Sequence, residues 1–140
     1  MKRSILNGKR ILGVNDEPDI LEILEEEILG ACPTCRFEKA TNYQQAVERM
    51  MHLTYDLVIL DNIGVRGFDL LECAVAYHRP AVMLTDYALK PDVLKRSIEM
   101  GARAYLPKEE LGEIVPFLED VLRHKNLTGW GRLLYNNRNR

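Results

Sequence analysis

The apolar run LVIL at residues 57–60 constrains the fold more than any other stretch of the sequence. It is continuously apolar and rich in residues of high β propensity, without the alternation typical of a strand that is exposed on one face. Such a run indicates a strand of a parallel sheet whose two faces are both covered by helices. We expect further strands, of which the second is the weakest, at residues 10–14, 35–39, 80–84 and 102–106.

Segments with apolar residues at helical spacing separate these runs. The expected helices cover residues 17–29, 42–51, 68–77, 90–101 and 113–124. Asp16 is expected to cap the first helix and Gly30 to end it. Pro116 would cost about 3 kcal/mol in a helix interior, so it must lie in the first turn of the last helix. Five strand–helix repeats predict a doubly wound α/β fold with right-handed crossovers.

Composition limits what such a chain can do. With 140 residues and a formal net charge of -2, it has no general attraction to nucleic acid or to anionic membranes. Its apolar runs are too short to span a bilayer, and the basic start is not followed by the core of a signal peptide. We therefore expect a cytoplasmic protein with no membrane association, and the charge argues against nucleic acid as a partner.

We expect three segments in the chain. Residues 1–9 form an N-terminal lead-in, residues 10–124 the domain, and residues 125–140 a basic tail that is partly disordered. Two of the three cysteines form a Cys32-x-x-Cys35 pair, which supplies at most two zinc ligands, and no second pair completes a site. We expect ordinary loop and strand cysteines, with a reactive thiol pair as the alternative.

Polar residues stand where the predicted strands end. Because parallel strands end at the same edge of a sheet, these side chains should converge there. They are Asn15, Asp16, Asp61, Thr85, Asp86 and Lys108. Clustered carboxylates suit a hard cation such as Mg²⁺ (or Mn²⁺), and a lysine beside them completes an anion site for phosphate. Each residue alone has an ordinary interpretation, such as a helix cap or a surface charge. Together they predict phosphoryl transfer to an aspartate.

Four motifs carry a resemblance to a known family. In chain order, from about Arg10 to Arg123, they are ILGVNDEPDI, YDLVILDNIGVRGFDLLE, PAVMLTDYA and GARAYLPK. They resemble the response-regulator receiver domain of bacterial two-component signalling. The resemblance implies a flavodoxin-like receiver fold, with a five-stranded parallel sheet in the order 2-1-3-4-5 and five flanking helices.

The resemblance also implies a function. A histidine kinase or phosphotransfer protein would phosphorylate the chain in a Mg²⁺-dependent reaction. Phosphorylation would switch the face formed by helix four, strand five and helix five, which controls an unknown downstream protein; a homodimer through that face is a further candidate. The expected chemistry is self-catalysed phosphoryl acceptance and autodephosphorylation only, so the chain is not an enzyme with turnover.

The metal and acceptor roles carry over residue by residue. The resemblance makes Asp61 the phosphoacceptor and Asp16 the acid that binds Mg²⁺ directly. The backbone carbonyl of Ile63 matches a further metal ligand. Asn15 stands where the family commonly has an acid. It could hold a metal-bound water through its carbonyl oxygen, but the lost charge predicts weaker Mg²⁺ affinity.

The remaining roles concern the switch. Lys108 matches the lysine that pairs with acceptor and phosphoryl oxygens. Thr85 matches the hydroxyl that moves to the phosphoryl group, and Tyr105 matches the aromatic residue that turns inward with it. Glu109 replaces the usual proline after the lysine, so we expect a trans peptide bond there. Bulky side chains at Ile63 and Tyr87 predict slow loss of the phosphoryl group, with loop packing as the alternative.

Two other functions compete with this one. The first is a receiver-like protein-interaction module that is not phosphorylated, which Asn15 motivates. The second is a phosphatase or hydrolase of similar build with an aspartate nucleophile. Such enzymes typically carry a second acid two residues after the nucleophile, where this chain has Ile63.

Overall fold

The computed structural model describes residues 4–61, 65–85 and 91–124. Five strands and five α-helices alternate along the chain, with a short 3₁₀ helix before the last α-helix. The strands are β1 (Arg10–Val14), β2 (Arg36–Ala40), β3 (Leu57–Asp61), β4 (Ala81–Thr85) and β5 (Ala104–Pro107). The helices are α1 (Pro18–Ala31), α2 (Tyr43–His52), α3 (Gly67–Ala76), α4 (Pro91–Glu99), η1 (Lys108–Glu113) and α5 (Ile114–Arg123). In the part of the chain that is described, no helix is long and apolar enough to cross a membrane.

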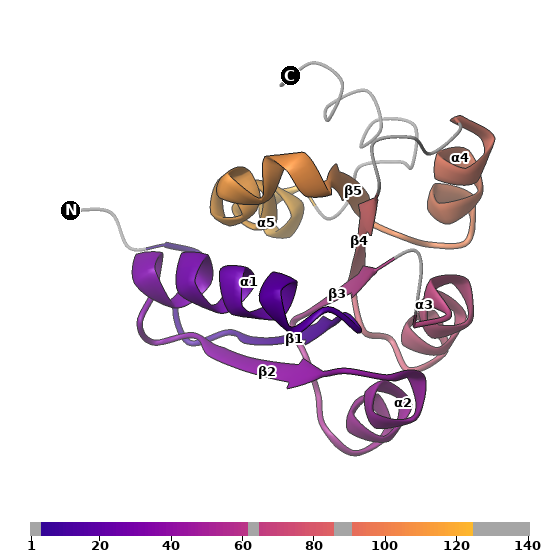
Figure 1. Cartoon of the computed structure of the whole chain (residues 1–140), viewed down its shortest axis with the longest axis horizontal. Helices are drawn as coiled ribbons and strands as arrows, with labels where there is room; N and C mark the ends of the chain where they lie inside the picture. Colours follow the sequence, from indigo (N-terminus) through magenta and orange to yellow (C-terminus); the bar gives the residue numbers. More distant parts are fainter. Residues whose placement is uncertain (1–3, 62–64, 86–90, 125–140) are drawn as a thin grey trace.

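The five strands form one parallel sheet in the order β2-β1-β3-β4-β5 (Figure 1). Helices α1 and α5 cover one face, and α2, α3 and α4 cover the other. This is the predicted architecture, and a strand was expected at or near each of these five positions, including the weakest one, β2. Strands β3 and β4 are buried along their whole length, as a sheet covered on both faces requires.

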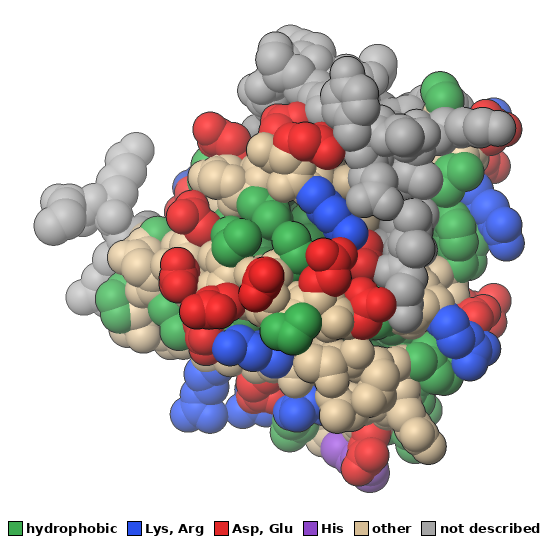
Figure 2. Space-filling view, viewed as in Figure 1, with side chains coloured by type: hydrophobic (Ala, Val, Ile, Leu, Met, Phe, Trp, Pro, Cys, Tyr) green, Lys and Arg blue, Asp and Glu red, His purple; other side chains and the backbone are tan. Residues whose placement is uncertain are grey.

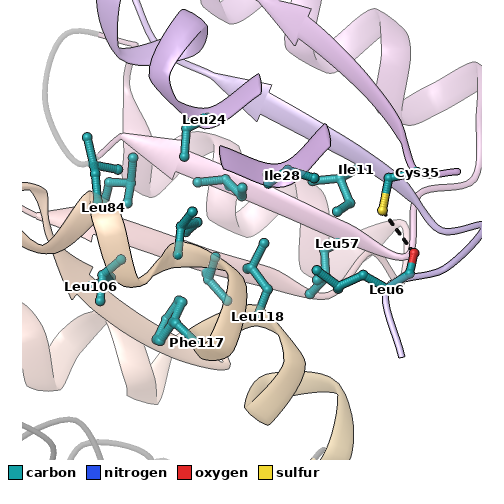
Figure 3. Close-up of a cluster of buried hydrophobic side chains, with 14 of the residues drawn as sticks. Leu6, Ile11, Leu24, Ile28, Cys35, Leu57, Leu84, Leu106, Phe117 and Leu118 are labelled. Carbon is teal, nitrogen blue, oxygen red and sulfur yellow. Dashed lines mark hydrogen bonds between the residues drawn. The ribbon is translucent and has the colours of Figure 1, made fainter. Parts of the chain in front are cut away.

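Each face of the sheet carries its own hydrophobic core. The core under α1 and α5 includes Leu24, Leu57 and Leu118 (Figure 3), and the core under the other helices includes Met50, Leu70 and Met83. Acidic residues of α1 lie on its outer side. Figure 2 shows acidic side chains gathered on the face that carries this helix; Glu22, Glu26 and Glu27 are exposed.

The start and end of α1 differ from the prediction. The N-cap position is held by Glu17, not by Asp16, and no side chain caps the helix. Instead, Asn15 Oδ1 accepts a hydrogen bond of 2.8 Å from the Glu17 N–H. This turn moves the helix start one residue along the chain and frees the Asp16 carboxylate. At the other end the helix continues through Gly30 and ends at Ala31. It stops there because Pro33 disfavours helical backbone in the residue before it.

The last part of the chain follows the prediction more closely. Pro116 is the third residue of α5, so it lies in the first turn as expected. The helix was expected from residue 113 but begins at Ile114, directly after the 3₁₀ helix η1. None of the described peptide bonds is cis, so the bond between Lys108 and Glu109 is trans as predicted. Our prediction of partial disorder concerns the C-terminal tail, residues 125–140, which lies outside the described residues.

Residues 4–9 pack on the domain. Leu6 is completely buried in the core under α1 and α5. The Cys35 thiol donates to the Leu6 carbonyl at 2.9 Å (Figure 3), and Ser4 Oγ donates to Glu119 Oε2 of α5 at 2.6 Å. Burial, followed by the nearby Cys32, raises the pKa of the Cys35 thiol to about 12. This thiol therefore stays protonated, which favours the structural interpretation of the Cys32-x-x-Cys35 pair.

Candidate functional site

The carboxyl ends of β1, β3 and β5 bring the predicted site residues together. Asp61 is the last residue of β3, and its side chain is only 2% exposed. Lys108 directly follows β5, and Asp16 lies in the turn between β1 and α1. Because all five strands are parallel and β3 is the central one, the residues that follow β1 and β5 lie at the same edge of the sheet as the end of β3.

Lys108 lies between two carboxylates. Its Nζ is 3.1 Å from Asp61 Oδ1 and 3.6 Å from Glu17 Oε1. The Lys108 side chain is 16% exposed, so its contact with Asp61 is largely shielded from water. An ammonium held this close to a buried carboxylate stabilises negative charge on that carboxylate and on any group attached to it.

Three carboxylates form a cluster at the same place. One oxygen from each of Asp16, Glu17 and Asp61 lies within 4.8 Å of the other two. Ligand oxygens around Mg²⁺ stand about 3–4 Å apart, since each is roughly 2.1 Å from the ion. Small side-chain rotations would therefore bring these oxygens onto one cation. The donor set, all hard oxygens and partly open to water, fits Mg²⁺ or Mn²⁺.

Glu17 was missed by the sequence analysis. It is exposed, and in the sequence it is one of many acids in the α1 region. Only the turn made by Asn15 places it beside Lys108 and Asp61. The signal that could have found it is the combination of Asn15, which favours such turns, with Pro18 at the helix start.

Asn15 makes a contact that the sequence did not predict. Its carbonyl oxygen, which we expected to hold a metal-bound water, accepts the Glu17 N–H. A second lone pair of that oxygen is left for the expected role. The residue is completely buried, and its amide nitrogen Nδ2 has no hydrogen-bond partner among the described residues. The side chain therefore presents a donor at this end of the sheet, where an aspartate would present an acceptor.

The two predicted switch residues lie on the opposite face of the sheet from Asn15. Thr85 ends β4 and is 2% exposed, and Tyr105 of β5 is 5% exposed in the core under α2, α3 and α4. Pairing of Met83 with Tyr105 and of Thr85 with Pro107 puts the two residues on neighbouring strands, one step apart along the same face. The expected carbonyl ligand Ile63, together with Asp86 and Tyr87, lies outside the described residues.

A buried aspartate ends the central strand β3. It is paired with a lysine that follows the edge strand β5 and is flanked by acids from the turn after β1. On a parallel sheet in the order 2-1-3-4-5, this arrangement defines a receiver domain. The family model of the response regulator receiver domain matches residues 11–117. The chain belongs to this family, which functions in two-component signalling.

Individual relatives agree with this assignment. The two-component response regulator ARR18 of Arabidopsis thaliana is 32% identical over 134 residues, which cover 91% of this chain. The chain spans 20% of the length of that relative. A response regulator from Hahella chejuensis is similar in structure, with a TM-score of 0.71, 26% identity and coverage of 81% of this chain and 95% of that one.

A further solved structure is that of the BeF3-activated DrrB receiver domain. It has a TM-score of 0.69 and 16% identity, and the match covers 83% of this chain and 98% of that one. At this identity the likeness concerns the fold alone.

Proposed function

We propose that this chain is a phosphoacceptor switch that receives a phosphoryl group on Asp61 from a histidine kinase or a phosphotransfer protein. The observation that carries the proposal is the contact of 3.1 Å between Lys108 Nζ and the buried Asp61 carboxylate, at the edge of a cluster of acids. A structural ion pair would not need two further carboxylates beside it, because they repel Asp61 unless a cation offsets them.

The chemistry balances without any further reactant. An Asp61 oxygen attacks the phosphorus of a phosphohistidine whose other ring nitrogen carries a proton. An O–P bond forms, and the P–N bond breaks with its electron pair going to nitrogen, which releases a neutral imidazole. Lys108 stabilises the charge that gathers on the acceptor and phosphoryl oxygens. Asp16 and Glu17 would hold Mg²⁺ together with Asp61. The bound cation would neutralise part of the phosphoryl charge. Attack by water on phosphorus later returns the free Asp61 carboxylate and phosphate, so the chain itself is not an enzyme with turnover.

The output of the switch lies on the face formed by α4, β5 and α5. Movement of Thr85 toward the phosphoryl group would free space beside the ring of Tyr105, which lies one step away on the neighbouring strand. Reorientation of that ring would change the surface that a downstream protein contacts, or through which a homodimer forms. We expect phosphorylation and the contact with the downstream protein to take place in the cytoplasm.

One observation favours a second function. Asn15 stands where the family commonly carries an acid. The loss of that acid fits a receiver-like interaction module that is not phosphorylated. The following experiment decides between the two functions.

The test is the intact mass after incubation with acetyl phosphate and Mg²⁺. We expect the wild-type chain to gain the mass of one phosphoryl group and the Asp61→Asn variant to gain none. Asp19→Asn is the matched control, because it removes an exposed carboxylate from the first turn of α1 outside the cluster. No gain in the wild-type chain at high Mg²⁺ would contradict the proposal and favour the interaction module.

A further inference from the structure

The strand register places Asn15 next to Asp61. In β1 and β3, Gly13 pairs with Ile59 and Val14 with Leu60, and Asn15 and Asp61 are the residues one step further along each chain. Neighbouring strands are about 4.8 Å apart. Since side chains alternate along a strand, Asn15 lies on the same face as Ile11, and Asp61 lies on the same face as Ile59. Both of these isoleucines belong to the core under α1 and α5, so the Asn15 and Asp61 side chains share that face.

The chemistry of the unpaired atom identifies the ligand that it lacks. The orientation of the amide is fixed, because Oδ1 accepts the Glu17 N–H at 2.8 Å. The group left without a partner is therefore an N–H donor, which cannot bind a cation. Leaving a buried donor unpaired costs about 1–3 kcal/mol, so such a group is expected to have a function.

We propose that Asn15 is an anion-binding residue of the acceptor site, whose Nδ2 donates a hydrogen bond to a phosphoryl oxygen carried on Asp61. This inference rests on the proposed function and deepens it. Lys108 already contacts Asp61 Oδ1, so the free donor of Asn15 is available to an oxygen that arrives with the phosphoryl group. An aspartate at position 15 would repel that oxygen.

The consequence is that the protein contributes more, and the cation less, to binding the phosphoryl group. A site with two acids at positions 15 and 16 binds the cation more strongly and relies on it to hold the phosphoryl group. Here one negative charge is absent and a donor takes its place. The chain should therefore bind Mg²⁺ weakly while still holding the phosphoryl group through its own side chain.

The experiment measures two affinities in parallel. Beryllofluoride, a stable mimic of the phosphoryl group, is titrated at saturating Mg²⁺ and followed by ¹⁹F NMR, and Mg²⁺ alone is titrated by calorimetry. We expect Asn15→Ala to bind beryllofluoride about tenfold more weakly than the wild-type chain, or worse, and Mg²⁺ about equally well. Asn42→Ala is the matched control: it also removes an asparagine Oδ1 that accepts a backbone N–H, but at the N-terminus of α2.

A second variant keeps the test valid if Asn15→Ala does not fold. Asn15→Asp keeps the size and the acceptor for Glu17 but replaces the donor, and Asn42→Asp is its control. We expect Asn15→Asp to bind Mg²⁺ more tightly and beryllofluoride more weakly at saturating Mg²⁺. The role of Asn15 is overturned if either Asn15 variant binds beryllofluoride as well as the wild-type chain does. If the wild-type chain neither binds the mimic nor gains phosphoryl mass, the proposed function fails and the role of Asn15 fails with it.

Discussion

At the scale of single residues, two glycines show how backbone conformation decides which side chain is tolerated. Gly101 has φ of +112°, and a Cβ there would lie 2.8 Å from Val75 Cγ2. Gly30 lies inside α1, and a Cβ there would meet no atom within 4 Å. The same methyl group therefore strains one site and suits the other.

The prediction compares Gly101→Ala with Gly30→Ala. We expect Gly101→Ala to lower the free energy of unfolding by about 1–3 kcal/mol, because it combines a left-handed backbone with a close contact. Gly30→Ala should raise that free energy by about 0.5–1 kcal/mol, since alanine favours helix. Urea unfolding measures both. Adding Val75→Ala to Gly101→Ala should restore only the part of the lost free energy of unfolding that comes from the close contact. Complete restoration would contradict the role of the backbone conformation.

The residues of the site were easier to predict from the sequence than the contacts between them. Asp61, Asp16 and Lys108 could be predicted because each is among the first polar residues after a strand. Glu17 and the orientation of the Asn15 amide could not be predicted. Both depend on a single hydrogen bond between a side chain and a backbone N–H, which the pattern of apolar residues does not encode.

At the scale of elements, the N-terminal turn is part of the core although it contains no helix or strand. Leu6 is completely buried, and contacts to Cys35 and Glu119 hold its turn against the domain. We expect Leu6→Ala to lower the free energy of unfolding by about 2–5 kcal/mol, because it leaves a cavity under α1 and α5. Met51→Ala, at a side chain 49% exposed, should change it by less than about 0.5 kcal/mol. Equal effects in urea unfolding would show that the turn does not contribute to the core.

The elements themselves were predicted to within a few residues. Strand β5 was expected from Ala102 but begins at Ala104, since Ala102 N–H still bonds to the Ser97 carbonyl at the end of α4. Apolar residues at such boundaries fit a strand and a helix end equally well. Local competition between hydrogen bonds, rather than the apolar pattern, then decides where an element begins.

At the scale of the whole molecule, binding at the site should change the stability of the fold. A ligand that binds only the folded chain stabilises it, by about 1.4 kcal/mol at ten times its dissociation constant. We therefore expect Mg²⁺ to raise the melting temperature of the wild-type chain relative to EDTA.

Two variants give the control for this measurement. Asp16→Asn should lose most of the rise with Mg²⁺, whereas Asp19→Asn should keep it, because only Asp16 belongs to the acid cluster. The comparison is made within each variant, with and without Mg²⁺, since removing a clustered charge can itself stabilise the fold. An equal rise in both variants would contradict a cation site at Asp16.

The alternation of strands and helices was enough to predict a parallel sheet, but not the order of its strands. That order came from the family resemblance and is confirmed by the structure. Short connections and right-handed crossovers leave several orders open, and the choice between them depends on long-range packing that a single sequence does not show.

The site draws its residues from the turn after β1, the end of β3 and the residue after β5, so only the folded sheet brings them together. A copy that has begun to fold but has not yet added β5 holds Asp61 without Lys108. Under the proposed function, such an incomplete copy would be a poor phosphoryl acceptor. The proposed phosphorylation would therefore depend on a completely folded sheet, since its acceptor and its lysine come from distant parts of the chain.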